Sequence, residues 1–382
     1  MKRVAIFGST GSIGKATLEV IKHLQTDFSV LALAARSNYP LLTEQIITFK
    51  PKIIAITEEK FKDKLYQRVK KEVKAITILS GESSLVELAQ FSQIDILVMA
   101  MSGTTGLMAL IKAIENKKRI ALSTKELLVS FGKIIMQQTK KYQAEILPID
   151  SELVGIHQCI NNYHPQQIKR VILTASGGPF LYRKHLKNIT IRDALKHPIW
   201  KMGKKITIDS ATLANKGLEV IETARLFSLP PQKIEVLIHP QSIIHAIVEF
   251  NDNISLATLS YPDMRGCIQY ALTYPKRLPS LIPKLDLVNR PNLEFYQPDF
   301  KKFPALKLAY QAAFADGTAP CVFNAANEVA VNGFINGKVQ FHHIPQIIKK
   351  TLSALPYVKN PNLITLLKYQ KMATDYAERL VV

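Results

Sequence analysis

The sequence predicts an α/β protein that begins with a doubly wound parallel sheet, continues with an α+β domain and ends with a small helical domain. Three observations predict this order. The first 150 residues alternate short β-branched runs with amphipathic segments. Longer strand patterns and loops with glycine and proline follow, and from Pro304 onward the apolar spacing is helical.

In the first predicted domain, residues 1–149, we expect seven buried strands at residues 4–7, 30–33, 53–56, 76–79, 94–99, 120–122 and 146–149. Helical patterns separate most of these runs. Repeated strand–helix units of this length form a parallel sheet whose ligand site lies at the carboxyl ends of the strands.

The second predicted domain covers residues 150–275, with strand patterns at 169–175, 234–238, 244–250 and 254–259. Asn251-Asp252-Asn253 predicts a hairpin turn between the last two strands. A helix with several polar residues is expected to begin near Ala211. Five prolines across residues 276–304 predict a linker over 276–303. The third predicted domain, 304–382, contains helical patterns at 305–315, 321–336, 344–354 and 363–380.

The composition excludes several classes of protein. With 47% hydrophobic and 21% charged residues among 382, the chain is neither disordered nor fibrous. Its mean hydropathy is +0.06 and it has no apolar run of membrane-spanning length, so no membrane partner is expected. Three widely spaced cysteines and no visible export signal predict a reducing, cytoplasmic setting.

The formal net charge of +20 is compatible with a nucleic-acid partner. The basic residues occur in scattered doublets, however, and the longest run is Lys117-Lys118-Arg119. A lysine-rich solvated surface is therefore the favoured interpretation, and we expect no nucleic-acid partner.

A glycine-rich segment at residues 8–14, Gly-Ser-Thr-Gly-Ser-Ile-Gly, follows the first strand and opens the first helix. Glycines permit a tight turn and close approach of a pyrophosphate, and the free N–H groups of a helix start face the anion. The spacing differs from the common G-x-G-x-x-G, so an ordinary strand–helix turn is the alternative. Its position directly after an N-terminal strand favours nucleotide binding.

The end of the second strand carries Arg36, Ser37 and Asn38, where an NAD site usually has an acidic residue. A cation with two short hydrogen-bonding side chains suits the extra phosphate of NADP. An arginine that simply faces solvent is the alternative, and NADP is favoured.

Asp150-Ser151-Glu152 follows the strand at 146–149. Residues two apart on an extended chain point to the same side, so both carboxylates can converge on an Mg²⁺ or Mn²⁺ ion, which prefers oxygen ligands. From these three residues alone, a helix N-cap is the simpler interpretation.

The segment 209–219 concentrates polar side chains, with Lys216 and Glu219 about one helical turn apart. Ser210, Asn215 and Lys216 are donors suited to a phosphate, and Glu219 would complete a carboxylate metal site. A plain amphipathic helix is the alternative, and function is favoured.

Two loops remain ambiguous from the residues alone. Ser176-Gly177-Gly178 at a strand end suits an anion-binding loop and an ordinary strand-exit turn equally well. Trp200, the only tryptophan, lies in a loop with Pro198 and Gly203 and is either a surface anchor or part of a lid over a ligand.

Together these motifs resemble those of the 1-deoxy-D-xylulose 5-phosphate reductoisomerase family. The resemblance covers essentially the whole chain, and the motifs occur in the family's order. They are GSTGSIG at 8–14, Lys125-Glu126, DSE at 150–152, SGGPF at 176–180, HP-x-W-x-MG at 197–203, DSAT-x-x-NKGLE at 209–219, HPQSIIH at 239–245, PDMR at 262–265 and NAANEVAV at 324–331.

The resemblance implies a Rossmann-like NADPH-binding domain, a central domain for catalysis, metal binding and dimerisation, and a helical C-terminal domain. It implies a reductoisomerase that uses NADPH and Mg²⁺ or Mn²⁺ to convert 1-deoxy-D-xylulose 5-phosphate into 2-C-methyl-D-erythritol 4-phosphate, in non-mevalonate isoprenoid synthesis. It also implies a homodimer.

The resemblance further assigns roles to individual residues. Asp150, Glu152 and Glu219 would bind the metal and, with Lys125 and His197, form the catalytic set. Lys125 and Ser151 would contact the substrate backbone, and Trp200 would close over it. Its phosphate would be held by Ser176, His197, Ser210, Asn215 and Lys216. The NADPH site would consist of Thr10, Gly11, Ser12, Ile13, Arg36, Ser37, Asn38, Glu126, Gly203 and Met264.

The chain departs from the family's pattern at three places. A cofactor segment of the Gly-Lys-Asn type is Arg36-Ser37-Asn38 here, which keeps a cation but moves it by one position. The family usually continues DSE with His, then Asn or Ser, then Ala, whereas this chain has Leu153-Val154-Gly155. It usually has Asn before Lys125-Glu126, where this chain has Thr124. Leu153-Val154-Gly155 leaves open a divergent paralogue that reduces another sugar phosphate.

Overall fold

The computed structural model describes residues 1–72, 76–160, 163–289 and 292–381, and the chain divides into two compact units. Unit 1 comprises Met1–Leu127, Ile135–Val154 and Asp263–Pro283; unit 2 comprises Leu128–Ile134, Gly155–Pro262 and Lys284–Val382. Residues 290 and 291 of the predicted linker and residue 382 of the predicted third domain lie outside the described residues. The division into three domains stays a prediction.

Unit 1 is built on a seven-stranded parallel sheet, and all seven strands fall where the sequence predicts them. The prediction that all seven are buried is wrong for β4, whose residues are exposed or only partly buried because it is an edge strand. The order β4-β3-β2-β1-β5-β6-β7 places β1 between β2 and β5, at the point where the direction of winding reverses and doubly wound sheets bind their ligands. The strands are β1 Lys2–Phe7, β2 Phe28–Ala35, β3 Ile53–Ile56, β4 Thr77–Ser80, β5 Ile96–Met99, β6 Arg119–Leu122 and β7 Glu145–Pro148.

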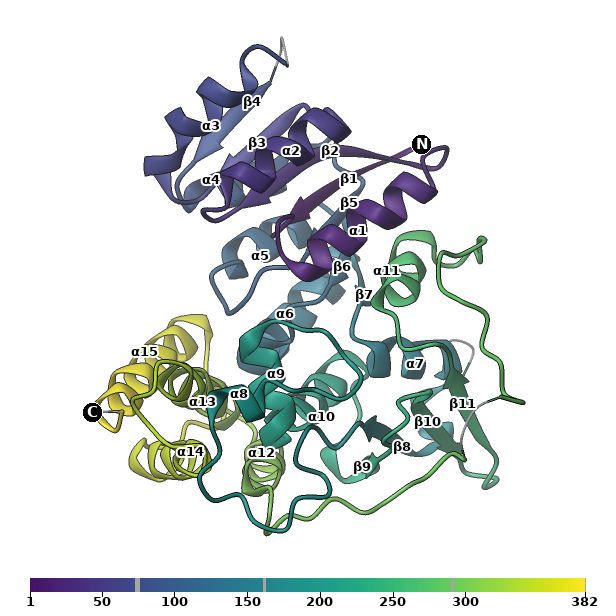
Figure 1. The fold of residues 1–382 in the computed structure, drawn as a ribbon, viewed down its shortest axis with the longest axis vertical. Coiled ribbons are helices and arrows are strands. Elements are labelled where there is room, and N and C mark those ends of the chain that lie inside the picture. Colours follow the sequence, from purple (N-terminus) through teal and green to yellow (C-terminus); the bar gives the residue numbers. More distant parts are fainter. Residues whose placement is uncertain (73–75, 161–162, 290–291, 382) are drawn as a thin grey trace. The chain divides into compact units, whose positions relative to one another are not determined.

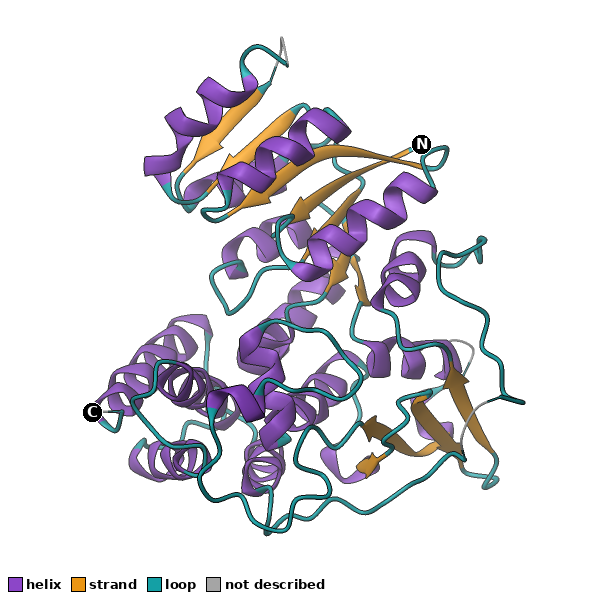
Figure 2. Ribbon diagram, in the orientation of Figure 1, coloured by secondary structure: helices purple, strands orange, loops and turns teal. Residues whose placement is uncertain are grey.

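Amphipathic helices connect these strands (Figures 1 and 2). In the first of them, Leu18 and Ile21 are buried while Lys15 and Glu19 are exposed, as expected for a helix with one apolar face. The helices are α1 Ser12–His23, α2 Tyr39–Phe49, α3 Lys62–Val69, α4 Ser83–Gln90, α5 Leu107–Glu115, α6 Lys125–Tyr142 and α7 Ser151–Ile160, and the 3-10 turn Glu59–Phe61 precedes α3. The residues of α6 and α7 are divided between the two units.

Helix α11 (Met264–Thr273) belongs to unit 1, although the strands of unit 2 precede it in the chain. It packs against α1, and its Ile268, Ala271 and Leu272 are completely buried in the same hydrophobic cluster as the sheet residues. The core of unit 1 is therefore completed by residues that follow Pro262.

Unit 2 contains a four-stranded sheet in the order β11-β10-β8-β9. β10 runs antiparallel to both neighbours while β8 and β9 are parallel, so the predicted largely antiparallel sheet is confirmed. The hairpin turn at Asn251-Asp252-Asn253 is confirmed as well, with Asn253 at a φ of 65°. The strands are β8 Ile168–Ala175, β9 Ile234–Ile238, β10 Ile244–Phe250 and β11 Ser255–Leu259.

The helices of unit 2 include the four predicted near the C-terminus (Figure 1). Many of their small apolar residues are buried in one cluster with the inner face of the four-stranded sheet. The helices are α8 Ile191–Ala194, α9 Lys204–Thr212, α10 Ala214–Leu226, α12 Pro304–Ala315, α13 Ala319–Ile335, α14 His343–Ala354 and α15 Leu363–Arg379, with 3-10 turns at Pro165–Gln167 and Pro231–Lys233.

The helix predicted to begin near Ala211 begins at Ala214 as α10, and a helix that was not predicted, α9, precedes it. The chain forms two helices there, α9 and α10, because Leu213 between them has a φ of 58° and a ψ of 11°. An L-residue in this left-handed conformation cannot continue a right-handed helix, and it costs roughly 1–2 kcal/mol. The break turns the chain between Ser210 and Asn215.

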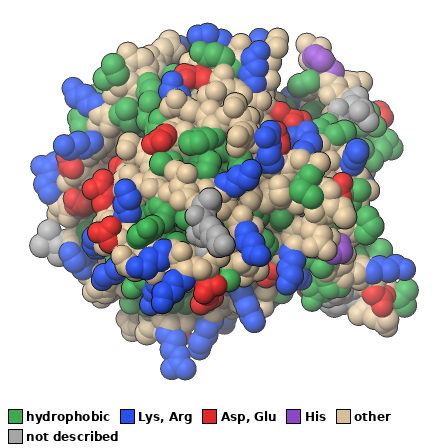
Figure 3. Space-filling model, turned by 90° about the horizontal axis from the view of Figure 1, so that it is seen from above, with side chains coloured by type: hydrophobic (Ala, Val, Ile, Leu, Met, Phe, Trp, Pro, Cys, Tyr) green, Lys and Arg blue, Asp and Glu red, His purple; other side chains and the backbone are tan. Residues whose placement is uncertain are grey.

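The positive charge is dispersed on the face of the molecule that Figure 3 shows. On the face that Figure 3 shows, lysine and arginine side chains lie among acidic and apolar ones. Within the described ranges, each helix is too short or too polar to cross a lipid bilayer.

Candidate active site

The glycine-rich turn joins β1 to α1 in unit 1 and is closely packed backbone to backbone. Gly8 has a φ of 87°, and a Cβ placed on it would lie 2.3 Å from the carbonyl oxygen of Ala100. A Cβ on Gly14 would lie 2.3 Å from the carbonyl oxygen of Gly8. α1 has no acidic residue in its first turn, and its N-cap Gly11 makes no side-chain cap. The exposed helix start is therefore fit to receive an anionic pyrophosphate.

A residue that sequence reasoning missed supports this turn. The Nε2 of Gln45, on α2, donates a hydrogen bond of 2.9 Å to the carbonyl oxygen of Ser9, and Gln45 is 5% exposed. A polar side chain buried against the turn fixes its position. Nothing in the pattern of α2 distinguishes Gln45 from a solvent-facing helix residue, so no local signal identified it.

The residues after β2 lie on the surface. The Nε of Arg36 is 3.1 Å from Oε1 of Glu58, and the Arg36 side chain is 82% exposed. Asn38 caps α2 by accepting a hydrogen bond from the backbone N–H of Leu41. Glu58 is only partly exposed and is also paired with Lys60, so an arginine that lies in water can exchange this partner for a phosphate.

A carboxylate pair lies where β7 leads into α7. The Nζ of Lys125, at the start of α6, forms an ion pair with Oδ2 of Asp150, and Lys125 is 5% exposed. The Oγ of Ser151 donates a 2.6 Å hydrogen bond to Oε2 of Glu152. Sequence reasoning thus named four residues that unit 1 brings together at the carboxyl end of its sheet: Lys125, Asp150, Ser151 and Glu152.

The negative charges of Asp150 and Glu152 act on the thiol of Cys267, on α11. Complete burial, followed by the negative charges of Glu152 and Asp150, raises the pKa of its thiol. The thiol therefore stays protonated, and the donors available here for a metal ion are carboxylate oxygens, which suit Mg²⁺ or Mn²⁺.

The departures at Leu153-Val154-Gly155 and at Thr124 serve packing. Leu153 and Val154 are 0% and 2% exposed, and the carbonyl of Gly155 accepts a hydrogen bond from Thr258. The Oγ1 of Thr124 donates to backbone carbonyls, at 2.5 Å to Met101 and 3.3 Å to Met99. These residues are therefore engaged by the protein itself.

Glu219 of unit 2 is 1% exposed, and both of its carboxylate oxygens have partners on α10. Oε1 accepts from Nδ2 of Asn215 at 2.5 Å, and Oε2 lies 2.5 Å from Nζ of Lys216, which is 4% exposed. The predicted spacing of one helical turn is what allows these contacts.

The break at Leu213 places Ser210 close to the loop after β8. Gly178 has a φ of 64°, and a Cβ on it would lie 2.8 Å from the carbonyl oxygen of Ser210. Thr212 holds the turn, because its Oγ1 donates to the carbonyl of Asp209 and accepts from the N–H of Ala214. The loop of Ser176 and the α9–α10 turn are thus neighbours.

His197 joins the same group with a defined tautomer. Its Nδ1 accepts hydrogen bonds from the backbone N–H of Trp200 at 2.8 Å and of Ile199 at 3.2 Å, so the ring proton is on Nε2. Nε2 then donates to Oγ of Ser176 at 2.9 Å. Burial lowers the pKa of His197 to about 4, which keeps the ring neutral near pH 7. We call Ser176, His197, Ser210, Asn215, Lys216 and Glu219 the unit 2 polar cluster.

This tautomer predicts how stability depends on pH. Because the folded pKa is about 4 and the unfolded value 6.5, the unfolded chain takes up a proton first as pH falls. The contribution of His197 is full above about pH 6.5 and is lost between pH 6.5 and 4. We expect a loss of about 1–2 kcal/mol, since the ring is partly exposed and solvent screens the effect.

The measurement is the free energy of urea unfolding at intervals from pH 7 to pH 4. His197→Gln should remove this part of the slope, whereas His185→Gln, at an exposed position of the same unit, should retain the slope of the parent protein. Equal slopes in the two variants would show that the ring of His197 does not titrate in this way.

A second set of missed residues lies behind the unit 2 polar cluster. The Nδ2 of Asn327, on α13, donates a 2.8 Å hydrogen bond to Oδ1 of Asp209, and Nζ of Lys205 lies 2.8 Å from Oδ2. Asp209 and Asn327 are 1% and 0% exposed. The NAANEVAV segment therefore helps to hold α9 in position beside Ser210, a contact that sequence spacing alone cannot reveal.

The remaining predicted site residues are divided between the units. In unit 1, Met264 packs at the edge of the core and Glu126 lies in the first turn of α6. In unit 2, Gly203 is the N-cap of α9 and is open to solvent. The ring of Trp200 lies 6.4 Å from that of His245. His239 of the HPQSIIH motif stabilises the turn that follows it, because its Nε2 accepts hydrogen bonds from the backbone N–H groups of Ile243 and Ile244.

Comparison with protein families gives a match over most of the chain. Residues 4–132 match the family described as 1-deoxy-D-xylulose 5-phosphate reductoisomerase. Residues 146–227 match the 1-deoxy-D-xylulose 5-phosphate reductoisomerase C-terminal domain, and residues 259–376 match the DXP reductoisomerase C-terminal domain.

Individual relatives agree over the full length. The 1-deoxy-D-xylulose 5-phosphate reductoisomerase of Thermodesulfovibrio yellowstonii is 45% identical, with 99% of each chain covered. That of Endomicrobium trichonymphae is 44% identical, with 100% of this chain and 99% of the relative covered.

Solved structures of relatives have the same fold. The enzyme of Zymomonas mobilis in complex with NADPH is 35% identical and superposes with a TM-score of 0.92, covering 100% of this chain and 99% of that one. A DOX-P reductoisomerase in complex with NADPH, fosmidomycin and magnesium is 37% identical, with a TM-score of 0.93 and coverage of 100% and 98%.

The doubly wound sheet, its glycine-rich turn and these comparisons define an NADP-dependent oxidoreductase of the α/β class. More specifically, the chain belongs to the 1-deoxy-D-xylulose 5-phosphate reductoisomerase family.

Proposed function

We propose that this chain isomerises and reduces 1-deoxy-D-xylulose 5-phosphate to 2-C-methyl-D-erythritol 4-phosphate with NADPH and a divalent cation, Mg²⁺ or Mn²⁺. At the level of residues, the observation that carries this proposal is a buried lysine–carboxylate pair in each unit, Lys125–Asp150 and Lys216–Glu219. Buried ion pairs contribute little net stability, so their presence indicates sites that are built for a charged ligand. The relative solved with NADPH, fosmidomycin and magnesium supports the choice of cofactors.

The cation would be held by three carboxylates, Asp150, Glu152 and Glu219. Each offers a carboxylate oxygen, the hard ligand type that Mg²⁺ and Mn²⁺ prefer. A cation held there supplies a positive charge that polarises the carbonyl and hydroxyl oxygens of the substrate.

Before ligands bind, Lys125 is the ion-pair partner of Asp150, and Lys216 is the ion-pair partner of Glu219. Once Asp150 and Glu219 have another partner, the Nζ of Lys125 and that of Lys216 each have donors available for substrate oxygens. We assign Lys125, with Ser151, to the substrate backbone and Lys216 to its phosphate. The binding of cation and of substrate would then favour each other.

The rest of the phosphate site would be Ser176, His197, Ser210 and Asn215. The Oγ of Ser176 accepts hydrogen bonds from His197 and from the N–H of Gly178 at 3.2 Å, which leaves its own proton to donate. A neutral His197 therefore orients a hydroxyl donor toward the anion. Because Trp200 donates its N–H to His197, the same ring links the phosphate site to the predicted lid.

NADPH would bind along the glycine-rich turn of unit 1. Thr10, Gly11, Ser12 and Ile13 would hold its pyrophosphate, and its extra phosphate would lie against Arg36, Ser37 and Asn38. Bound NADPH supplies the hydride, and Glu126, Gly203 and Met264 would complete its site. Closure of Trp200 over the substrate would exclude water from the aldehyde that the hydride reduces.

The test is the consumption of NADPH by the intact chain with 1-deoxy-D-xylulose 5-phosphate. We expect turnover with Mg²⁺ or Mn²⁺, at least a hundredfold loss with excess chelator, and recovery when the cation is restored. Circular dichroism with chelator controls for unfolding. Turnover that chelator leaves unchanged would contradict the metal assignment, and faster turnover of another sugar phosphate would favour a divergent paralogue.

We also propose that the chain forms a homodimer through its central domain. β11 is an edge strand, and Leu256 and Leu259 on it are 38% and 39% exposed. Exposed edges with apolar side chains are commonly covered in native proteins. We expect a sedimenting mass about twice that of one chain, and a reduced dimer fraction in Leu256→Lys; a monomer at assay concentration would exclude the proposal.

Finally, we propose a cytoplasmic location. Cys159, Cys267 and Cys321 are free and buried, which suits a reducing compartment. Fractionation of the source cells would test this, and recovery of the protein outside the cytoplasm would overturn it.

A further inference from the structure

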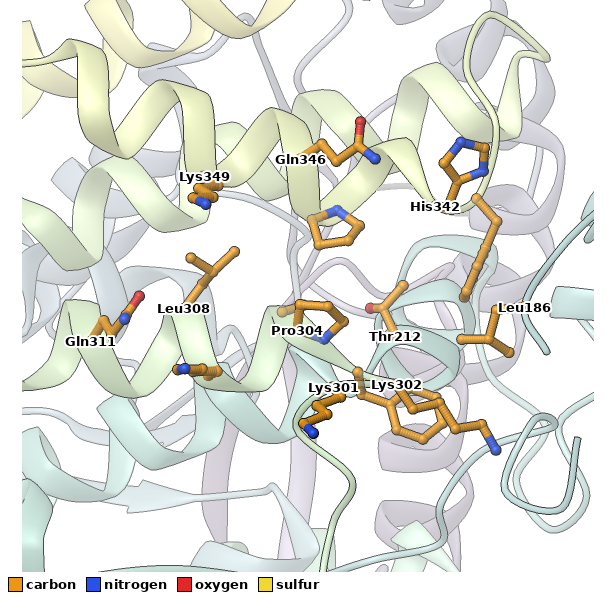
Figure 4. A pocket seen from close by; sticks show the side chains of 15 residues that line it. Leu186, Thr212, Lys301, Lys302, Pro304, Leu308, Gln311, His342, Gln346 and Lys349 are labelled. Carbon is orange, nitrogen blue, oxygen red and sulfur yellow. The ribbon is translucent and has the colours of Figure 1, made fainter. Parts of the chain in front are cut away.

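A cavity of about 460 Å³ lies in the helical part of unit 2, apart from the residues of the unit 2 polar cluster. One side is formed by residues 301–311, which comprise the segment before α12 and the first part of that helix. The other side is formed by residues 341–349, which comprise the end of the preceding loop and the first part of α14 (Figure 4). Leu186 and Thr212 complete the lining. This volume is within the range of small-molecule sites in proteins.

The floor of the cavity is apolar and firmly packed. Phe303 and Phe341 are 3% and 4% exposed, and Leu308 is 9% exposed. All three belong to the main hydrophobic cluster of unit 2, so their positions are fixed by the core. A ligand with an apolar group would bury that group without rearrangement of the floor.

The rim of the cavity is positively charged. Lys301, Lys302 and Lys307 come from the α12 side and Lys349 from α14. None of the described residues that line the cavity is acidic. Asp299 lies next to the rim, but its Oδ1 accepts the backbone N–H groups of Lys301 and Lys302 at 2.9 Å each, which ties it to the turn.

One lysine of the rim is held in place while the others are exposed. The Nζ of Lys302 donates to the carbonyl of Leu181 at 2.9 Å, and burial lowers its pKa. Lys301 and Lys349 are exposed, so their ammonium groups can move to a ligand. Several cations around an apolar floor attract an anion and reject a cation.

We propose that this cavity binds an organic phosphate whose apolar group lies on Phe303, Leu308 and Phe341 and whose phosphate is held by Lys301 and Lys349. A phosphate dianion matches two mobile ammonium groups, and the floor requires an apolar body that inorganic phosphate lacks. No residue that lines the cavity belongs to the proposed substrate site, although Thr212 of the lining lies in the turn between Ser210 and Asn215.

Calorimetric titration of the full chain with hexyl phosphate tests this proposal, with inorganic phosphate and hexanol as probes of the two halves of the ligand. We expect hexyl phosphate to bind at least about tenfold more tightly than either half. No detectable binding of hexyl phosphate, or equal binding of hexanol, would overturn the proposal.

Two variants locate the binding. The double variant Lys301→Gln, Lys349→Gln removes the charge, and Gln346→Trp fills the cavity from an exposed lining position. Each should weaken hexyl phosphate at least about tenfold. The control for the charge variant is the double variant Lys187→Gln, Lys350→Gln, and the control for the filling variant is Lys350→Trp. These positions are exposed and do not line the cavity. The affinity of the controls for hexyl phosphate should stay within about twofold of the parent value.

A further variant separates this site from the proposed substrate site. Lys216→Gln should leave the binding of hexyl phosphate to the cavity unchanged. If binding persists in both cavity variants but is lost in Lys216→Gln, the probe occupies the unit 2 polar cluster and the cavity proposal is wrong.

Discussion

Replacement of Glu219 by glutamine is expected to lower kcat by about a thousandfold or more. The substitution keeps the shape and the hydrogen bond from Asn215 but removes the negative charge that the proposed cation needs. The loss of several kcal/mol of charge stabilisation in the transition state corresponds to about three orders of magnitude in rate. The measurement is steady-state NADPH consumption over a range of Mg²⁺ concentrations.

The control for this variant must separate charge from folding. Glu219 is paired with Lys216 at 1% exposure, so glutamine also leaves a buried ammonium with a neutral partner. Binding of NADPH, proposed for unit 1, should persist and show that the chain is folded. Glu235→Gln, which removes a half-exposed carboxylate paired with Arg170, should retain activity. Turnover of Glu219→Gln within tenfold of the parent, with its metal dependence intact, would refute the role of Glu219.

The alanine variant of Gly14 is expected to lose NADPH affinity by about a hundredfold or more. A Cβ there would lie 2.3 Å from the carbonyl oxygen of Gly8 and 2.5 Å from Cα of Ser9, both backbone atoms. The turn must therefore move away from α1, which displaces the N–H groups proposed to face the pyrophosphate. We expect a cost in stability of roughly 2–3 kcal/mol as well.

Fluorescence titration of NADPH measures the first effect, and thermal unfolding measures the second. Lys15→Ala, at the next residue and on the exposed face of α1, should change neither. An NADPH Kd for Gly14→Ala within threefold of the parent value would mean that the turn is not the cofactor site.

The architecture could be predicted because it depends on local periodicity. The seven strands of unit 1 are short apolar runs between helical patterns, and such runs indicate strands of a parallel sheet. Their burial depends also on the neighbouring strands, since β4 at the sheet edge stays partly exposed. The break at Leu213 could not be predicted, since leucine favours helices and the left-handed conformation is imposed by packing. The place of α11 in unit 1 likewise depends on contacts between residues far apart in the sequence.

The same distinction applies to the candidate site. Lys216 and Glu219 could be paired from their spacing on a helix, and the structure has that ion pair. The ion pair of Lys125 with Asp150 and the hydrogen bond of Ser176 with His197 join residues on different elements. Gln45 shows the limit most clearly, because it is an ordinary polar residue in a helical pattern and only its buried partner indicates a role. Asn327 lies in the NAANEVAV motif, but its contact with Asp209 joins residues far apart in the sequence.

The passage of the chain between the two units has a consequence for biosynthesis. The polypeptide crosses from one unit to the other five times, and the core of unit 1 includes Ile268, Ala271 and Leu272 of α11. During synthesis on the ribosome, more than a hundred further residues must follow β7 before α11 is made and covers the apolar surface of unit 1. The hydrophobic core of unit 1 is therefore completed only late in synthesis. A fragment that ends after β7 would leave this apolar surface exposed, so it would aggregate or bind chaperones.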